Sequence, residues 1–296
     1  MRKLHQFSAG EWLRLVPFGQ AFRQVRNHLL LRHYRHVRPP QLAEFLARHH
    51  HLKGGRVAIV IAFRQPWSLD WQLQMAARYL PGTELLVFDN SGDEGIRREI
   101  QRVCDHHQVS CFGLPPYQTA HVNRSHGMAM SWVYHNVVRA LRPDIFGFLD
   151  HDLIPMEPVD VDERLRGQPV YGVLNAGNLG HWSLWAGYCF YRFAYTEGKP
   201  LNFLYDFSRQ LDTGGHNWDT LYSVLPRADL RFAPQQFLRM QPPAAAESRQ
   251  VEVIDGAWIH MGGISYNDNF QRKHAFFASM KKAIDGGAGW RELEVF

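Results

Sequence analysis

The stretch that decides the fold, residues 145–155, reads Ile-Phe-Gly-Phe-Leu-Asp-His-Asp-Leu-Ile-Pro. Its first five residues lack polar side chains, as expected for a strand that is buried on both faces of a parallel sheet. Asp150 and Asp152 follow at the carboxyl end of that strand, where open α/β sheets bind their ligands. Two carboxylates there can hold a hard divalent cation through oxygen atoms and leave room for diphosphate oxygens.

An Asp-x-Asp triplet alone does not identify such a site. A second triplet, formed by Asp160 and Asp162, occurs further along the chain. That triplet precedes Glu163 and is typical of the start of a helix. The first triplet differs because an apolar strand leads directly into it.

Strands alternate with helices on the amino-terminal side of this stretch. Apolar runs predict strands at residues 57–63, 84–88, 109–112 and 145–149. The helices between them are predicted to begin at Ser68, Asp93 and Ser125. This alternation predicts an α/β fold with a mainly parallel sheet flanked by helices. Polar residues follow three of the strands, so their carboxyl ends would meet in one crevice with several carboxylates.

The carboxyl-terminal half is less regular. Apolar segments at 170–174, 187–193 and 251–260 predict strands, and residues 212–225 contain a predicted helix. We find no internal repeat and no second domain boundary after residue 55. The expected organisation is therefore a basic helical extension, residues 1–54, followed by one domain, residues 55–296.

The extension is strongly basic. Residues 1–56 contain eleven lysines and arginines against two acidic residues, a balance of +9, whereas the whole chain carries +5. An apolar stripe at helical spacing is formed by Leu15, Phe18, Phe22, Val25 and Leu29. The leading interpretation is a helical cap that docks on the main domain. The alternative is a helix that lies on an anionic membrane surface through residues 1–52. Nucleic acid is not expected, because no recognition motif accompanies the charge.

The composition excludes several classes of protein. Hydrophobic residues make up 45% and charged residues 21% of the 296 residues, which argues against a disordered, collagenous or membrane-embedded chain. No apolar run reaches the length of a membrane span, and no signal-peptide pattern follows Met1. The three cysteines form neither a disulfide framework nor a zinc motif, so we expect a cytoplasmic protein.

Four segments in this order resemble the GT-A glycosyltransferases, particularly glycosyltransferase family 2. They are Val57-Ala-Ile-Val-Ile-Ala-Phe63, Leu85-Leu-Val-Phe-Asp-Asn-Ser-Gly92, Asn123-Arg-Ser-His-Gly-Met-Ala129 and Phe148-Leu-Asp-His-Asp-Leu-Ile-Pro155. The resemblance covers residues 56–155 well and residues 170–262 loosely. It implies the GT-A fold, a nucleotide-sugar donor and a divalent metal, usually manganese or magnesium.

The resemblance also implies roles for single residues. Asp89 would contact the nucleotide base, and Ala62 and Phe63 would touch the nucleotide. The base and ribose neighbourhood would include Asn123, Arg124 and Gly127. Asp150 would reach the ribose or a metal-bound water, and Asp152 would bind the metal. His260 lies at the end of a late strand, where several GT-A enzymes place a histidine that binds the metal or the diphosphate; a structural histidine is the alternative.

The Glu-Asp pair from which the family usually supplies the catalytic base is absent here, so two other residues are candidates for that role. Asp212 is the preferred candidate and Asp219 the alternative; a helix-capping role is the structural explanation for either. His181, Trp182 and Trp185 could form a sugar-stacking wall or belong to the core. Residues 236–240 nearly match a motif of processive synthases, but methionine replaces its tryptophan, so we reject processive synthesis.

Together these features predict a metal-dependent glycosyltransferase that moves a sugar with inversion to a hydroxyl of a glycan or lipid-linked saccharide. A role in cell-envelope polysaccharide biosynthesis and a place on the inner face of the membrane would follow. The alternatives are a non-catalytic nucleotide-sugar or carbohydrate-binding module and a sugar nucleotidyltransferase. The latter needs a glycine-rich first loop, and residues 63–67 contain no glycine.

Overall fold

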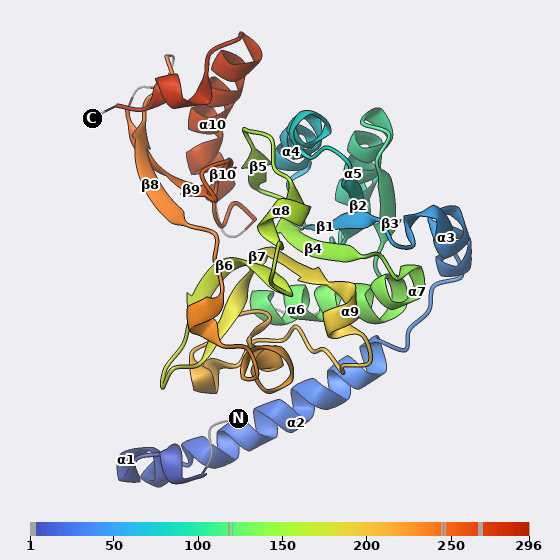
Figure 1. Cartoon of the computed structure of the whole chain (residues 1–296), viewed down its shortest axis with the longest axis vertical. Coiled ribbons are helices and arrows are strands. Elements are labelled where there is room, and N and C mark those ends of the chain that lie inside the picture. The colour runs from blue at the N-terminus through green and yellow to red at the C-terminus, as the bar shows by residue number, and fades with distance from the viewer. Residues whose placement is uncertain are drawn as a thin grey trace.

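The protein is a mixed α/β structure with two sheets. The computed structural model describes residues 4–117, 119, 121–243, 245, 247–265 and 269–295. Figure 1 shows a central sheet between helices, a smaller sheet with α10 at one end, and α1 and α2 along the opposite side. Residues 1–3 of the basic extension lie outside the described residues.

The central sheet is mainly parallel, as the sequence predicts. In sheet order its strands are β3 (Ser110–Gly113), β2 (Glu84–Asp89), β1 (Arg56–Ala62), β4 (Ile145–Asp150), β7 (Trp182–Arg192) and β6 (Val170–Ala176). The first four run parallel, and β7 is antiparallel to both β4 and β6. Because β1, β2 and β4 are neighbours, their carboxyl ends lie side by side, as the crevice prediction requires.

Helices cover both faces of this sheet. They are α4 (Pro66–Tyr79) and α5 (Glu94–His106) on one face, and α6 (Val122–Val133), the π-helical turn Tyr134–Val138 and α7 (Arg139–Leu141) on the other. Side chains of β1 alternate between the two cores: Val60 packs with Leu73 of α4, and Ile59 packs with Met128 of α6. This alternation explains why the whole strand is apolar.

Of the three predicted helix starts, one agrees with the structure. Asp93 does cap α5, accepting a hydrogen bond from Ile96 N at 2.9 Å. The predictions for Ser68 and Ser125 are wrong, because both serines lie inside their helices. Pro66 begins α4, since its fixed backbone angle suits a first helical position. His121 precedes α6, and its side chain accepts from Arg124 N.

The smaller sheet is antiparallel. Its order is β5 (Leu153–Pro155), β10 (Trp258–His260), β9 (Arg249–Ile254) and β8 (Gln235–Met240). The single strand predicted at 251–260 is a hairpin, because Asp255 and Gly256 take positive φ angles and turn the chain back. The sheet packs on α10 (Asn269–Asp285) around Ile259 and Met280.

The remaining elements are short, apart from those of the extension. They are η1 (Leu4–Gln6), α1 (Ala9–Leu13), α2 (Val16–Tyr34), α3 (Leu42–Arg48), η2 (His50–Leu52), α8 (Val161–Arg164), α9 (Phe193–Thr196), η4 (Phe207–Arg209), η5 (Gly215–Asn217), η6 (Trp218–Tyr222), η7 (Arg227–Asp229) and η8 (Trp290–Leu293). The helix predicted in residues 212–225 is thus only the two short turns η5 and η6. Asp160 caps α8, as predicted for the second triplet.

The extension does form helices, but α2 docks with an unexpected face. The predicted apolar stripe is exposed, with Phe18 64% and Phe22 68% accessible. The buried face carries Asn27, Leu31 and Tyr34 instead. The cap interpretation is therefore right about docking and wrong about the face that docks. Within the described ranges, no helix combines the length and apolarity needed to cross a bilayer.

Candidate functional site

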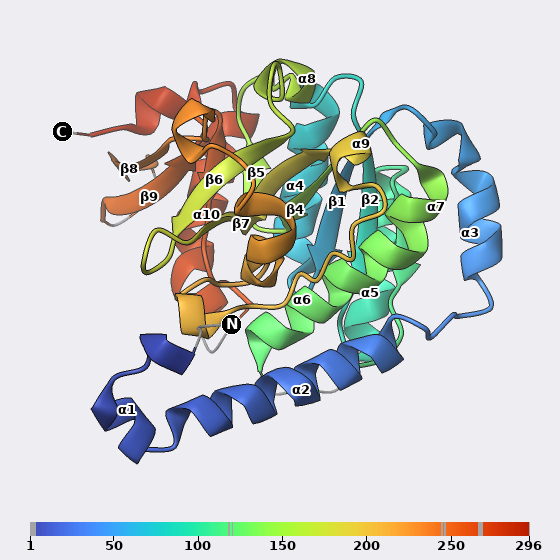
Figure 2. The ribbon, with the colours of Figure 1, turned by 60° about the horizontal axis from the view of Figure 1, so that its bottom comes forward.

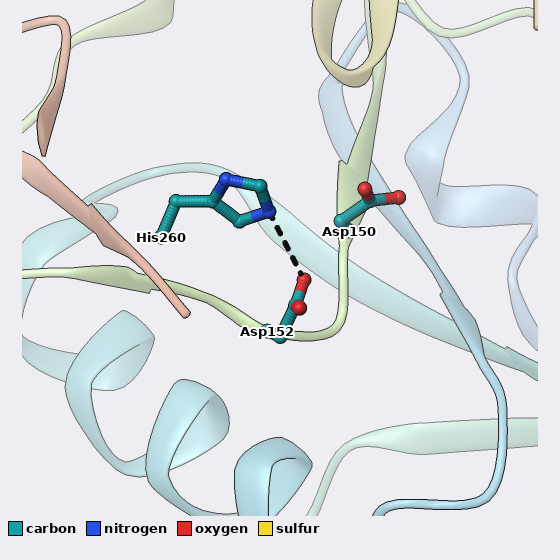
Figure 3. Close-up of side chains that lie close together, drawn as sticks. All are labelled: Asp150, Asp152 and His260. Atoms are coloured by element: carbon teal, nitrogen blue, oxygen red, sulfur yellow. Dashed lines mark ion pairs between the residues drawn. The ribbon is translucent and has the colours of Figure 1, made fainter. Parts of the chain in front are cut away.

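Asp150, Asp152 and His260 meet where the two sheets join. Asp150 ends β4, and the chain then turns through Asp152 into β5. Strand β5 pairs with β10 so that Leu153 lies opposite His260, which brings the imidazole to the aspartates. One ligand atom from each of the three side chains lies within 4.8 Å of the others. Figure 3 shows His260 pointing toward Asp152, with Asp150 beside them.

The charges of this cluster are strongly coupled. His260 Nε2 lies 3.5 Å from Asp152 Oδ1, and its Nδ1 lies 2.5 Å from Glu252 Oε2. Burial alone would lower the pKa of His260, but Asp152 and Glu252 raise that pKa to about 10. Burial, together with the charge of Asp152, raises the pKa of Asp150 to about 6. Burial opposes ionisation of Asp152 as well, yet His260 holds its pKa below the usual range.

This donor set fits a divalent cation. Two carboxylates and one imidazole suit manganese, and the carboxylates also suit magnesium. Glu252 accepts the Nδ1 proton of His260, which leaves Nε2 facing the aspartates, the arrangement that carboxylates commonly impose on metal-binding histidines. A bound cation would replace the proton that Nε2 otherwise holds and would neutralise the buried carboxylate of Asp152 and the partly buried one of Asp150.

A cavity of about 870 Å³ opens beside the cluster at the carboxyl ends of β1, β2 and β4. Its volume is within the range of small-molecule sites. The lining residues come from the strand ends, from α6 and from the loop after β10. They include Phe63, Arg64, Asn90, Ser91, Arg97, Tyr117, Ser125, His126, Asp150, His151, Asp152 and Ser265. The predicted crevice is therefore present.

The residues predicted to contact the nucleotide at the ends of β1 and β2 differ in whether they reach the cavity. Phe63 lines the cavity, whereas Ala62 is buried in β1. Asp89 is also buried: Oδ1 accepts from Ser91 N at 2.8 Å, and Oδ2 lies 3.6 Å from Arg97 Nε. Burial raises the pKa of Asp89. In this structure Asp89 shapes the turn, and Ser91 reaches the cavity.

The three residues predicted on α6 do not line the cavity. The amide of Asn123 donates to the carboxylate of Asp212, and Arg124 donates to Thr119 Oγ1 at 3.3 Å. Gly127 packs against the backbone of Phe203, where an added Cβ would lie 2.5 Å from the carbonyl oxygen. The same helix instead presents Ser125 and His126 to the cavity.

The two candidate bases occupy different surroundings. Asp212 is exposed and accepts from Thr213 N at 2.8 Å. Asp219 is bound by both carboxylate oxygens to Arg209, at 2.9 Å each. Asp212 is thus exposed and held beside α6 by Asn123, whereas the carboxylate of Asp219 is already paired with an arginine.

Two histidines at the site were not singled out from the sequence. His126 Nε2 lies 3.8 Å from Asp150 Oδ1, and burial lowers the pKa of His126 to about 4. His151 Nε2 lies 2.9 Å from Ser265 Oγ, which donates to Phe63 O at 2.8 Å. Both histidines belong to the segments that carry the family resemblance. Their place beside the predicted site residues in the sequence was the signal that could have identified them.

The proposed aromatic wall is divided. Trp185 lies against His260, with ring centroids 4.9 Å apart. Trp182 is core, packed on Tyr222, and His181 contacts Trp218. Only Trp185 of the three thus borders the metal cluster. Gly187 keeps space open nearby, since an added Cβ would lie 2.6 Å from Asp150 Oδ2.

Comparison with known proteins gives partial likenesses to solved structures. No protein-family model matches the sequence, and no curated protein is similar to it in sequence. One similar structure is the mannosyltransferase PcManGT from Pyrobaculum calidifontis in complex with GDP-Man and Mn²⁺, at 9% identity and a TM-score of 0.35, covering 53% of each chain. Another is glucosyl-3-phosphoglycerate synthase from Mycobacterium tuberculosis with Mn²⁺, UDP and phosphoglyceric acid, at 15% identity and a TM-score of 0.33, covering 51% of this chain and 60% of that one. S. aureus TarS is similar at 14% identity and a TM-score of 0.34, covering 50% of this chain.

These likenesses are limited in extent. The chain spans 30%, 53% and 60% of the lengths of TarS, the mannosyltransferase and the synthase. One of the three, PcManGT, is a mannosyltransferase. They do not define a donor, an acceptor or a mechanism for this protein.

Proposed function

We propose that this protein is a metal-dependent glycosyltransferase of the GT-A type, which transfers a sugar from a nucleotide-sugar donor to an acceptor hydroxyl. The observation that supports this most is the meeting of Asp150, Asp152 and His260, because the two aspartates also line the 870 Å³ cavity. A diphosphate needs both a cation and space, and the carboxyl ends of the parallel strands offer both there.

The side chains around the cluster would act together. A cation held by Asp150, Asp152 and His260 would stabilise the negative charge that develops on the departing nucleoside diphosphate. Glu252 orients His260, and Gly187 leaves room for the carboxylate of Asp150. Arg64 lines the cavity and supplies positive charge for phosphate oxygens.

Asp212 is the proposed base in this reaction. Its exposed carboxylate is oriented by Asn123 and Thr213, so it can accept the proton of an incoming hydroxyl. Attack by that hydroxyl would form the new glycosidic bond as the bond to the diphosphate breaks, with inversion at the sugar carbon. The acceptor in this proposal is a glycan or lipid-linked saccharide, the cation is manganese or magnesium, and the pathway is cell-envelope polysaccharide synthesis.

The test is a thermal-shift screen with UDP-, GDP- and CMP-sugars, with and without Mn²⁺, followed by an assay for released nucleoside diphosphate. We expect one donor class to stabilise the protein only when Mn²⁺ is present, and Asp152→Asn to abolish both the stabilisation and the turnover. Asp160→Asn is the matched control, because asparagine caps α8 as well as aspartate does.

Two outcomes would contradict the proposal. A wild-type protein that responds to no donor would exclude the donor class, and an Asp152→Asn variant with unchanged turnover would exclude the metal role. Donor binding without any turnover, in the presence of a range of saccharide acceptors, would favour the non-catalytic binding module.

A further inference from the structure

The outer face of α1 and α2 is apolar and uncovered. Eight of the twelve large apolar side chains that are exposed in the described part of the chain lie within the first 37 residues. Five of them follow one another at spacings of three and four residues, from the residue that precedes α2 into the helix, and each is 57–68% exposed: Leu15, Phe18, Phe22, Val25 and Leu29. A contiguous apolar stripe of this kind marks an interaction surface more often than a chance exposure.

The fold itself does not use this stripe. Helix α2 is held on the domain by its opposite face, where Tyr34 Oη donates to Pro115 O at 2.9 Å. Asn27 Nδ2 donates to Tyr205 Oη at 3.4 Å, and the rings of Tyr34 and Tyr117 lie 5.2 Å apart. In Figure 2, α2 runs along the edge of the molecule below α6, and no other element covers its outer side. Apart from the contact of Phe18 with Trp12 of α1, the stripe is free for a partner in the described part of the chain.

The surroundings of the stripe are basic. Between residues 4 and 43 the chain contains one acidic residue, Glu11. Arginines lie along α2 and just beyond both of its ends: Arg14, Arg23, Arg26, Arg32, Arg35 and Arg38. Arg23 and Arg32 are exposed, and Arg32 lies one turn beyond Leu29. Apolar side chains bordered by arginines are the pattern of a helix that lies in a membrane interface.

We propose that the outer face of α1 and α2 docks on an anionic lipid bilayer. The stripe would enter the apolar edge of the bilayer, while the flanking arginines pair with lipid phosphates. A nucleic acid could satisfy the arginines but offers no apolar phase to five large side chains. A second copy of the chain could cover the stripe but would bring the same arginines together, which disfavours that contact.

Docking would also place the cavity close to the bilayer. Pro115 and Tyr117, which contact the inner face of α2 through Tyr34, line the cavity. One helix would thus touch the bilayer on its outer side and the cavity rim on its inner side. The docking proposal itself stands independently of the proposed transfer reaction, and its test needs no turnover.

The test is flotation of the full chain with vesicles. We expect the protein to float with vesicles of phosphatidylcholine and phosphatidylglycerol, and not with phosphatidylcholine alone. Raising the salt should weaken binding, because the screening length falls from about 10 Å at 0.1 M to about 3 Å at 1 M. Phe18→Ser combined with Phe22→Ser should reduce the vesicle affinity at least tenfold, since each phenylalanine loses its apolar burial.

Matched variants distinguish the contribution of the stripe and its arginines from the effect of changing any exposed apolar or basic side chain. Val25→Ser should weaken binding, whereas Val224→Ser, at a site of similar exposure, should not. Arg23→Gln with Arg32→Gln should weaken binding, whereas Arg98→Gln with Arg102→Gln on α5 should leave it nearly unchanged. All of these side chains are exposed, so equal thermal unfolding would show that the variants fold.

Four results would overturn the proposal. The first is a wild-type chain that does not float with anionic vesicles, and the second is a double phenylalanine variant that floats as the wild type does. A dimer in solution that the phenylalanine changes dissociate would instead assign the stripe to contact between copies. Salt-sensitive binding to RNA that is indifferent to those changes, without flotation, would assign the basic face to nucleic acid.

Discussion

At the scale of single residues, the orientation of His260 depends on Glu252. Glu252 accepts the Nδ1 proton, and so it determines which imidazole nitrogen faces Asp150 and Asp152. The contact with His260 also lowers the pKa of Glu252, which keeps it ionised. Such a carboxylate increases the basicity of a metal-binding imidazole and fixes its orientation. Glu252 is therefore expected to influence the cation without touching it.

The change Glu252→Gln should weaken Mn²⁺ binding by roughly 10- to 100-fold, because the amide can still accept the hydrogen bond but carries no charge. Isothermal titration or the electron spin resonance of free Mn²⁺ would measure the affinity. Glu84→Gln, an exposed position at the start of β2, is the control. An unchanged affinity in Glu252→Gln would show that His260 does not bind the cation.

At the scale of elements, α6 is positioned by a close backbone contact. Gly127 lets the helix approach the segment at Phe203, and Ser131 Oγ donates to Gly127 O at 2.6 Å and accepts from Phe203 N at 2.9 Å. This contact fixes the height of the helix over the sheet. Ser125 and His126, which directly precede Gly127 on the helix, thereby reach the cavity.

The change Gly127→Ala should destabilise the protein by about 1–3 kcal/mol, because the carbonyl that the new methyl group meets belongs to the backbone and cannot rotate away. Chemical denaturation would measure the loss in the free energy of unfolding. Gly10→Ala in α1 is the control, since an added Cβ there meets nothing within 4 Å. A Gly127→Ala variant as stable as wild type would mean that α6 can move away from Phe203 without cost.

At the scale of the whole molecule, the cluster of Asp150, Asp152 and His260 joins the two sheets. Asp150 ends a strand of the central sheet, and His260 ends a strand of the smaller one. Asp152 lies between them, and its carbonyl accepts from Met261 N at 3.0 Å. A cation bound here would tie together parts of the chain that are more than 100 residues apart, and it would oppose the repulsion between buried carboxylates.

Mn²⁺ should therefore stabilise the whole fold. At a concentration one hundred times its Kd, it should add about 2.7 kcal/mol to the free energy of unfolding, which raises Tm by several degrees. Calorimetry with Mn²⁺ and then with excess chelator would measure the rise and its reversal. An equal rise in Asp152→Asn would show that the ion binds elsewhere.

The sequence by itself determined the parallel sheet, the crevice at its carboxyl edge and the Asp150–Asp152 pair, because these follow from runs of apolar residues and from what comes next in the chain. It also identified Asp160 as a helix cap, which is a local property.

The tertiary structure decided the rest. The stripe on α2 was visible as a pattern, but periodicity reports only which residues share a face and not which face a neighbour covers. The register of β9 with β10 pairs His260 with Glu252. The close packing of α6 produces the contact at Gly127, and the packing of the turn after β2 encloses Asp89. Those are contacts between distant segments, and local sequence patterns carry no information about their distances.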